Sequence, residues 1–188
     1  MLGILLAAGV SHRMGSDKLG LPWRGSTVLS STLARWSAVP EFDEILLVCR
    51  SDNSEIRWPR VRTVVNTGAD EGMGSSLRLA AHSLPLGTEC VVVGLADMPE
   101  IASGTISALI EAWRPLGSAG IVAPVFKGQR GHPVVLGSDH FPALRLLTGD
   151  RGARTILQAQ SADLQLVDVD DSGVLFDLDT PADLERQP

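Results

Sequence analysis

The feature that most constrains the fold is a set of short apolar segments that do not alternate with polar residues. They are rich in valine, isoleucine and leucine, and they span Gly3–Ala7, Glu44–Val48, Val61–Val65, Cys90–Leu95 and Ile121–Val125. Strands with this composition are typical of a parallel sheet, because helices cover both of its faces and neither face meets water. The pattern therefore predicts the buried strands of a parallel sheet.

Segments with helical periodicity lie between these strands. Apolar residues recur at helical spacing in Thr27–Ser37, Ser75–Ser83 and Ser103–Trp113, so each segment is expected to bury one face. Strands that alternate with helices along the chain are typical of an α/β sandwich. We therefore expect an α/β fold.

The second half of the chain is less regular. We expect strands at Gly131–Leu136 and Leu164–Val169, and helical pieces at Ala143–Leu147 and Ala153–Gln158. A further helix is expected at Thr180–Glu185, because Thr-Pro is a common helix start. The sequence contains no internal repeat and no linker, so residues 1–188 are expected to form one domain.

The charge balance limits the partners of the protein. Lysine and arginine number 16 against 22 acidic residues, a net charge of −6, which disfavours non-specific binding to nucleic acid or a membrane surface. Cys49 and Cys90 lie in apolar segments and are expected to be reduced core thiols. The sequence has no signal-peptide pattern and no apolar segment near the ~20 residues of a spanning helix. We therefore expect a cytoplasmic protein that binds anions through local cations.

The first strand runs into a loop that collects glycines and cations. In LAAGVSHRMGSDK, Gly9 and Gly15 allow a ligand close to the backbone, and Arg13 and Lys18 add positive charge, which suits a polyphosphate. The spacing is not that of a Walker A loop, because five residues separate the glycines and the lysine follows the second by three. A dinucleotide-binding fingerprint is also missing, which argues against a Rossmann-type oxidoreductase. The alternative is an ordinary loop with surface cations.

Carboxylates follow two later segments. VVVGLADMPE ends its apolar run on Asp97, and FDLDTPADL carries Asp177 and Asp179 at alternate positions of an extended segment, so both can face one side. Ligands of open α/β sheets bind beyond the carboxyl ends of the strands, and carboxylates there are suited to hold Mg²⁺ on a phosphate. The alternatives are an N-cap role for Asp97 and solvated acids before a helix for the other two.

Six motifs, taken in order, resemble the molybdopterin nucleotidyltransferases. They are LAAGVSHRMGSDKLGLPWRG, GMGSSLRLA, GLADMP, GQRGHPVVL, GDRGAR and DLDTPADL. RGHPV and GDRGAR are similar to the molybdenum cofactor cytidylyltransferase branch, and LAAG resembles its cytidylyl-type variant, whereas guanylyl-type enzymes look like LAGG. The resemblance covers nearly the whole chain and implies a three-layer α/β/α sandwich with a mostly parallel, Rossmann-like sheet. One departure is Gly20, where the family more often has a larger apolar residue.

The resemblance implies where the nucleotide and the metal bind. It implies nucleotide-binding roles for Leu6, Ala7, Ala8, Gly9, Arg13, Lys18, Asn66, Ser75 and Ser76. It also implies that Asp97 carries Mg²⁺, helped by Asp177 or Asp179. Arg13, Lys18 and Asp97 would then be the catalytic residues, because phosphoryl chemistry depends on positioning and on neutralising charge.

The resemblance also implies an acceptor site in the C-terminal half. His132 would hydrogen-bond the pterin or its phosphate, and Arg151 and Arg154 would clamp that phosphate. The alternatives remain a structural histidine at a strand entry and surface arginines at a helix start.

The reaction implied by the resemblance is transfer of CMP from CTP to the phosphate of molybdopterin or the molybdenum cofactor, with release of pyrophosphate. A molybdenum hydroxylase would receive the product. Two other functions stay open. One is transfer from GTP, or to a sugar or polyol phosphate, and the other is a non-catalytic accessory that hands on the cofactor.

Overall fold

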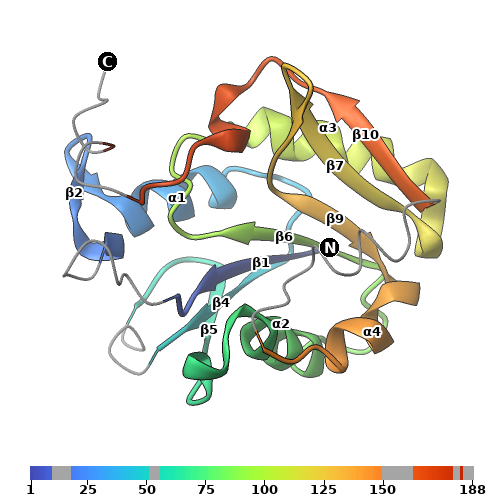
Figure 1. Cartoon of the computed structure of the whole chain (residues 1–188), viewed down its shortest axis with the longest axis horizontal. Helices are drawn as coiled ribbons and strands as arrows, with labels where there is room; N and C mark the ends of the chain where they lie inside the picture. The colour runs from blue at the N-terminus through green and yellow to red at the C-terminus, as the bar shows by residue number, and fades with distance from the viewer. Residues whose placement is uncertain (10–17, 51–55, 150–162, 180–182, 184–188) are drawn as a thin grey trace.

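One mixed sheet forms the centre of the computed structural model, which describes residues 1–9, 18–50, 56–149, 163–179 and 183 (Figure 1). The strands are β1 (Leu2–Ala7), β4 (Glu44–Cys49), β5 (Val61–Val65), β6 (Cys90–Leu95), β7 (Ile121–Phe126), β8 (Gln129–Arg130), β9 (Val134–Gly137) and β10 (Leu164–Asp168). Their order is β10-β7-β9-β6-β1-β4-β5, with β8 paired to β7. Neighbours pair in parallel except where β9 meets β6 and β7 and where β8 meets β7. The predicted mostly parallel sheet is confirmed.

Helices cover both faces of the sheet, as Figure 1 shows. One face carries α1 and α3 and the other carries α2 and α4, with bounds Val28–Ser37, Ser103–Trp113, Met73–His82 and Phe141–Arg145. Leu5 and Ala7 of β1 pack in the core beneath α1 and α3, whereas Ile4 and Leu6 pack in the core on the opposite face. Both faces of the strand are therefore buried, which explains its non-alternating sequence and confirms the three-layer sandwich.

Two glycines let α1 approach the sheet closely. Trp36 of α1 stacks on Phe42 with ring centroids 5.5 Å apart. A Cβ atom at Gly94 of β6 would lie 2.3 Å from Cζ2 of Trp36, and one at Gly3 of β1 would lie 3.1 Å from the same indole ring. The indole therefore fills the space that side chains at these two positions would need.

A short hairpin that the sequence pattern did not predict precedes α1. It consists of β2 (Pro22–Trp23) and β3 (Ser26–Thr27). Arg24 and Gly25 connect them with positive φ angles of 46° and 80°, the conformation of a tight two-residue hairpin turn. Thr27 then caps α1 by accepting a hydrogen bond from the amide of Ser30 (3.1 Å).

The predicted strand at Gly131–Leu136 is shorter than expected, because β9 begins only at Val134. The amide of Gly131 donates to the carbonyl of Pro124, and the amide of His132 donates to the carbonyl of Val174. Both residues therefore pair outside β9, and Pro133 has no N–H to donate to the sheet.

The predicted helices of the described part are present, and α3 has the predicted bounds, whereas the ends of the others are shifted. α2 begins at Met73, directly after Gly72 with a φ of 103°, rather than at Ser75. α4 covers Phe141–Arg145 rather than Ala143–Leu147, because Pro142 is well suited to the first helical turn.

The two cysteines and the helix lengths agree with the sequence. Cys49 and Cys90 are buried free thiols, and burial raises the pKa of Cys90 to about 11, so this thiol stays protonated. No helix within the described ranges is long and apolar enough to cross a bilayer. Two predicted segments, Ala153–Gln158 and all of Thr180–Glu185 except Asp183, lie outside the described residues.

Candidate active site

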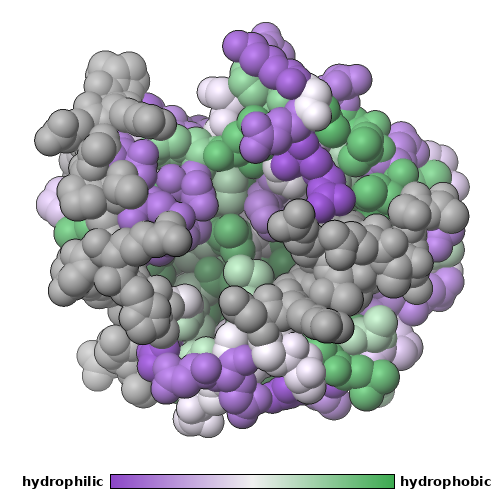
Figure 2. Space-filling model, viewed as in Figure 1, coloured by the Kyte–Doolittle hydropathy of each residue, from purple (hydrophilic) through white to green (hydrophobic). Residues whose placement is uncertain are grey.

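A cleft of about 930 Å³ opens beyond the carboxyl ends of β1 and β6. Segments far apart in the sequence form it, and its lining includes Leu6, Ala7, Ala8, Gly9, Lys18, Leu19, Ala69, Asp70, Glu71, Gly72, Met73, Ser76, Leu95, Asp97, Asp177 and Asp179. Figure 2 shows hydrophobic groups on the floor of a hollow on this face, with hydrophilic groups beside it. The cleft therefore lies at the edge of the sheet where the sequence predicts ligand binding.

Lys18 links the first loop to the two acidic segments. Its Nζ atom lies 2.5 Å from Oδ2 of Asp97 and 3.0 Å from Oδ1 of Asp179. Burial alone would lower the pKa of Lys18, but the hydrogen bonds and charges of Asp97 and Asp179 outweigh burial and raise it. The lysine is therefore a cation at neutral pH, held within a pair of carboxylates.

Asp97 is held by its backbone at the end of β6. The amide of Ala96 donates to the carbonyl of Leu6 (3.0 Å), and the hydroxyl of Thr32 donates to the carbonyl of Ala96 (2.9 Å). The amide of Leu178 donates to the carbonyl of Asp97 (3.1 Å). Contacts from the sheet, from α1 and from the C-terminal segment thus fix where the carboxylate lies.

The N-cap alternative for Asp97 is wrong. The N-cap of α3 is Ala102, whose amide donates to Oδ2 of Asp171 (2.9 Å), and Thr105 donates to the same oxygen (2.6 Å). Oδ1 of Asp97 is instead buried and has no hydrogen-bond partner among the described residues. A buried carboxylate oxygen without a partner is costly, so this atom is suited to hold a cation.

Asp177 and Asp179 both line the cleft, while Leu178 between them is fully buried. The extended backbone therefore turns both acids to one side, as their alternate positions predict. Partial burial and then the charges of Asp179 and Asp97 raise the pKa of Asp177, which shows that negative charge is concentrated here.

The charges of the cleft suggest how a metal would bind. Two of the five carboxylates in the described lining, those of Asp70 and Glu71, are paired with arginines. The other three still outnumber the one ammonium group, a balance that repels a triphosphate unless cations enter with it. Within the part of the chain that the structure describes, no three acidic, histidine or cysteine side chains form a ready metal cluster. Carboxylate oxygens suit Mg²⁺, which is usually held by one or two carboxylates together with phosphates of the substrate.

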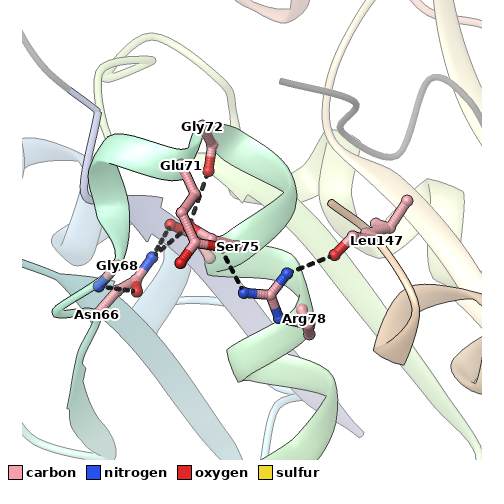
Figure 3. Close-up of polar contacts among 8 residues, drawn as sticks. Asn66, Gly68, Glu71, Gly72, Ser75, Arg78 and Leu147 are labelled. Atoms are coloured by element: carbon pink, nitrogen blue, oxygen red, sulfur yellow. Dashed lines mark hydrogen bonds and ion pairs between the residues drawn. The ribbon is translucent and has the colours of Figure 1, made fainter. Parts of the chain in front are cut away.

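A neutral hydrogen-bond network supports the cleft at the beginning of α2 (Figure 3). The side-chain amide of Asn66 donates to the hydroxyls of Ser75 (2.8 Å) and Ser76 (2.9 Å), and its oxygen accepts from the amide of Gly68 (3.0 Å). Ser75 donates in turn to the carbonyl of Gly72 (2.8 Å). Ser76 lines the cleft, whereas Asn66 and Ser75 are not among its described lining residues and hold the loop before α2 from within.

The same loop is joined to the C-terminal half of the chain. Arg78 of α2 donates to the carboxylate of Glu71 (2.8 Å) and to the carbonyl of Leu147 (2.8 Å), as Figure 3 shows. The amide of Gly74 donates to the carbonyl of Gly149 (2.9 Å). The chain therefore reaches the beginning of α2, beside the cleft, just before the predicted acceptor arginines.

The predicted acceptor residues are placed only in part. His132 does not line the cleft formed by the described residues, but its Nδ1 atom is buried and has no hydrogen-bond partner among them. Burial lowers the pKa of His132, although the charge of Asp97 acts in the opposite direction. Arg13, Arg151 and Arg154 lie outside the described residues.

Sequence reasoning missed the residues that hold the carboxylates in place. Thr32 and Asp171 act on backbone groups that are 64 and 69 positions away along the chain. A signal was available for Thr32, because it is a polar residue on the buried stripe of a helix. No comparable signal marks Asp171.

An α/β sheet with a charged cleft at its carboxyl edge is typical of the class of protein that binds its ligands at the strand ends. Residues 3–164 match the MobA-like NTP transferase domain, and the chain therefore belongs to that family of nucleotidyltransferases. The family suggested by the sequence motifs is confirmed.

Several named proteins and solved structures are similar to this chain over nearly its whole length. Purine catabolism protein PucB of Bacillus subtilis is 29% identical over 98% of this chain and 94% of its own. Molybdenum cofactor cytidylyltransferase of Escherichia coli is 26% identical over 96% of this chain and 91% of its own, and other relatives are named guanylyltransferases. The crystal structure of Rv0371c from Mycobacterium tuberculosis is 29% identical and covers 98% of this chain and 95% of its own, with a TM-score of 0.82. A complex of Rv0371c with manganese gives a TM-score of 0.77 at 27% identity, covering 98% and 96%.

Proposed function

We propose that this protein transfers CMP from CTP to the terminal phosphate of molybdopterin or the molybdenum cofactor and releases pyrophosphate. The observation that carries the proposal is the group formed by Lys18, Asp97 and Asp179 at the strand ends. A triphosphate supplies anions for the lysine, and its metal supplies a cation for the carboxylates. The cytidylyltransferase name of the Escherichia coli relative supports this choice of reaction.

The proposed nucleotide site is the segment Leu6–Gly9 together with Lys18, Ser76 and Arg13. The segment lines the cleft, and Ala8 is buried with 2% of its surface exposed, so a larger residue there would fill space beside the base. Asn66 and Ser75, both predicted to bind nucleotide, contribute through the hydrogen bonds that fix the first turn of α2, which carries Ser76. We propose that CTP is selected at Ala8.

The proposed chemistry is an in-line displacement at phosphorus. A phosphate oxygen of the acceptor forms a bond to the α-phosphorus of CTP, and the bond from that phosphorus to the bridging oxygen of the β-phosphate breaks. The electron pair leaves with pyrophosphate. A phosphate monoester has a second pKa of about 6 and is largely ionised at neutral pH, so no general base is needed. Lys18 and Arg13 stabilise the charge that builds on the leaving group.

The described carboxylates fit a divalent metal. Oδ1 of Asp97 is buried and has no hydrogen-bond partner among the described residues, and burial together with the charges of Asp179 and Asp97 raises the pKa of Asp177. Both features favour a cation at this place. Mg²⁺ held by Asp97 with Asp177 or Asp179 would neutralise charge on the reacting phosphates. A metal held there would take up part of the charge of Asp97 and Asp179, so that Lys18 could turn from these carboxylates to the phosphates.

The proposed acceptor site is the C-terminal half of one domain, with His132, Arg151 and Arg154. The amide of Gly74 donates a hydrogen bond to the carbonyl of Gly149, which brings the segment preceding the arginines to the beginning of α2, beside the cleft. This contact supports an acceptor site in the C-terminal half. We propose further that the protein acts in the cytoplasm and passes its product to a molybdenum hydroxylase.

Turnover with single nucleotides tests the proposed reaction. The purified protein is supplied with molybdenum cofactor, Mg²⁺ and either CTP, GTP or UTP, and pyrophosphate is measured. We expect release with CTP. Release with GTP alone would overturn the choice of cytidylyl transfer, and release only with a sugar or polyol phosphate as acceptor would overturn the choice of pterin.

Asp97→Asn distinguishes a catalyst from an accessory protein. We expect turnover to fall by about 100-fold or more, as when one charge-stabilising group is removed from an active site, while CTP still binds. Asp168→Asn is the matched control, because Asp168 is exposed on β10. Cofactor insertion that survives Asp97→Asn would support a non-catalytic accessory instead.

A further inference from the structure

One carboxylate, Glu100, contacts the hairpin that follows Lys18. It lies three residues after Asp97, and its side chain is 21% exposed. Oε1 accepts a hydrogen bond from the indole of Trp23 (3.1 Å), and Oε2 lies 3.0 Å from the guanidinium of Arg24. Glu100 therefore joins the loop after β6 to the segment that carries the lysine.

Trp23 in turn contacts the segment that carries the other two carboxylates. Its ring lies 5.9 Å from that of Phe176, measured between centroids, and Phe176 directly precedes Asp177. Trp23 is only 1% exposed, so its N–H needs an acceptor inside the protein, and Glu100 provides one. In Figure 1 the C-terminal segment, in red, runs toward the hairpin that contains β2.

The backbone of Glu100 is also in close contact with the C-terminal segment. A Cβ atom added to Gly173 would lie 2.5 Å from the carbonyl of Glu100, so only glycine permits this approach. Two residues farther on, the amide of Ala102 is bound to Asp171. The three segments that carry the site carboxylates and Lys18 thus meet at Glu100.

We propose that Glu100 is a positioning residue for nucleotidyl transfer and acts through the indole N–H of Trp23. It holds the segments of Lys18, Asp97 and Asp177 at a fixed separation without touching the substrate. The inference rests on the proposed function, because a positioned lysine and carboxylates matter only to a reaction between phosphates. Small displacements of reacting groups cost up to about 100-fold in rate.

The two oxygens of Glu100 explain why a carboxylate suits this place. One oxygen accepts from a neutral indole, and the other faces the guanidinium of Arg24, with that of Arg35 4.0 Å away. A carboxamide has one acceptor oxygen and would turn its NH₂ group toward either the indole or the arginines. Glu100→Gln therefore keeps the size of the side chain but loses one of the two contacts.

The test compares kcat with nucleotide affinity in three variants. For Glu100→Ala we expect kcat for pyrophosphate release to fall 10- to 100-fold, while the Kd for CTP, measured without acceptor, stays within threefold. Glu100→Gln and Trp23→Phe are expected to lie between this variant and the natural protein. In the double variant of Trp23→Phe and Glu100→Ala, kcat should fall no further than in Glu100→Ala.

Trp113→Phe is the matched control. Trp113 is also buried, and its N–H has no hydrogen-bond partner among the described residues, so kcat should stay within twofold. A normal kcat per folded molecule in Glu100→Ala and Glu100→Gln, with only a lower Tm, would show a purely structural role and overturn the proposal. If the losses of kcat in Trp23→Phe and Glu100→Ala multiply in the double variant, Glu100 does not act through Trp23.

Amide exchange keeps the test independent of turnover. The amide of Leu178 donates to the carbonyl of Asp97, and we expect it to exchange at least tenfold faster in Glu100→Ala. If the natural protein releases no pyrophosphate with any nucleotide, the proposed function fails, and faster exchange at Leu178 in Glu100→Ala still shows that Glu100 holds this segment in place. An unchanged exchange rate at Leu178 overturns the positioning role of Glu100.

Discussion

The two walls of the cleft are stabilised in different ways. The neutral wall, Ser76 with Asn66 and Ser75 behind it, is held by hydrogen bonds within the protein. The charged wall, formed by Lys18, Asp97 and Asp179, combines a short ion pair with a buried carboxylate oxygen that has no described partner. The neutral wall is held together without a ligand, whereas the proposed function requires the charged wall to exchange partners when a ligand binds.

This difference separates stability from activity. Satisfied neutral hydrogen bonds contribute to folding, typically about 0.5–1.5 kcal/mol each, and they keep the loop in one shape. Charges near one another in a partly buried cleft stabilise the fold less, because their desolvation offsets their attraction. Variants of the neutral wall should therefore change unfolding first, and variants of the charged wall should change turnover first.

The largest effect is expected for Lys18→Ala. The variant loses the described cation of the cleft, so we expect kcat for pyrophosphate release to fall about 100-fold, with a smaller change in the free energy of unfolding. Lys127→Ala removes an exposed lysine from the turn between β7 and β8 and serves as the control. A large loss of stability without a loss of kcat would break the comparison.

Asn66→Ala should affect the free energy of unfolding more than kcat, the opposite of Lys18→Ala. The change leaves the hydroxyls of Ser75 and Ser76 without their donor, and we expect a loss of about 1–3 kcal/mol in the free energy of unfolding. The turnover of the folded fraction should fall less than in Lys18→Ala. Ser118→Ala, which removes an exposed hydroxyl that is bonded to Asp139, controls for a generic surface effect in chemical denaturation.

Lys18→Gln tests whether Asp97 and Asp179 exchange Lys18 for a metal when nucleotide binds. In the absence of nucleotide, the ammonium group of Lys18 competes with a metal for Asp97 and Asp179. Removing that charge should tighten Mn²⁺ binding to the nucleotide-free protein by about 10-fold, or roughly 1.4 kcal/mol. Titration followed by electron paramagnetic resonance measures it, and weaker binding in the variant would contradict the exchange.

The smallest effect concerns pH. Burial lowers the pKa of His132 below its ordinary value of 6.5, so the unfolded chain binds a proton more readily than the folded one. Stability is therefore complete above about pH 6.5 and falls as the pH decreases from there through the lowered pKa. His132→Asn should lose less stability over this interval than the natural protein does. His82→Asn changes an exposed histidine and should behave like the natural protein in thermal melts across this pH range.

The sequence was sufficient for the main parallel strands and for the edge of the sheet where their ends gather charged residues. Strands covered on both faces carry a distinct composition, so β5 and β6 lie where the pattern predicts them, and helical periodicity predicts the bounds of α3. The edge of the sheet that gathers Lys18 and Asp97 also follows from strand direction. Cleft-lining positions for Asp177 and Asp179 follow from the alternation of an extended chain.

The contacts that hold those groups could not be predicted in the same way. The bond from Thr32 to the carbonyl of Ala96 and the bond from Trp23 to Glu100 join residues 64 and 77 positions apart. The partners in these bonds depend on the position of each helix and hairpin along the sheet, and side-chain packing determines that position. The predicted beginning of β9 was wrong for the same reason, because the amide of His132 donates its hydrogen bond to the carbonyl of Val174.

The bond from the amide of Leu178 to the carbonyl of Asp97 has a consequence for heat tolerance. It attaches the segment bearing Asp177 and Asp179 to the sheet, but this segment is not itself one of the strands of that sheet. Segments outside the central hydrogen-bonded ladder open with less free energy than the whole fold requires. On warming, catalytic capacity should therefore fade while the circular dichroism of the sheet is still unchanged, and it should return on cooling.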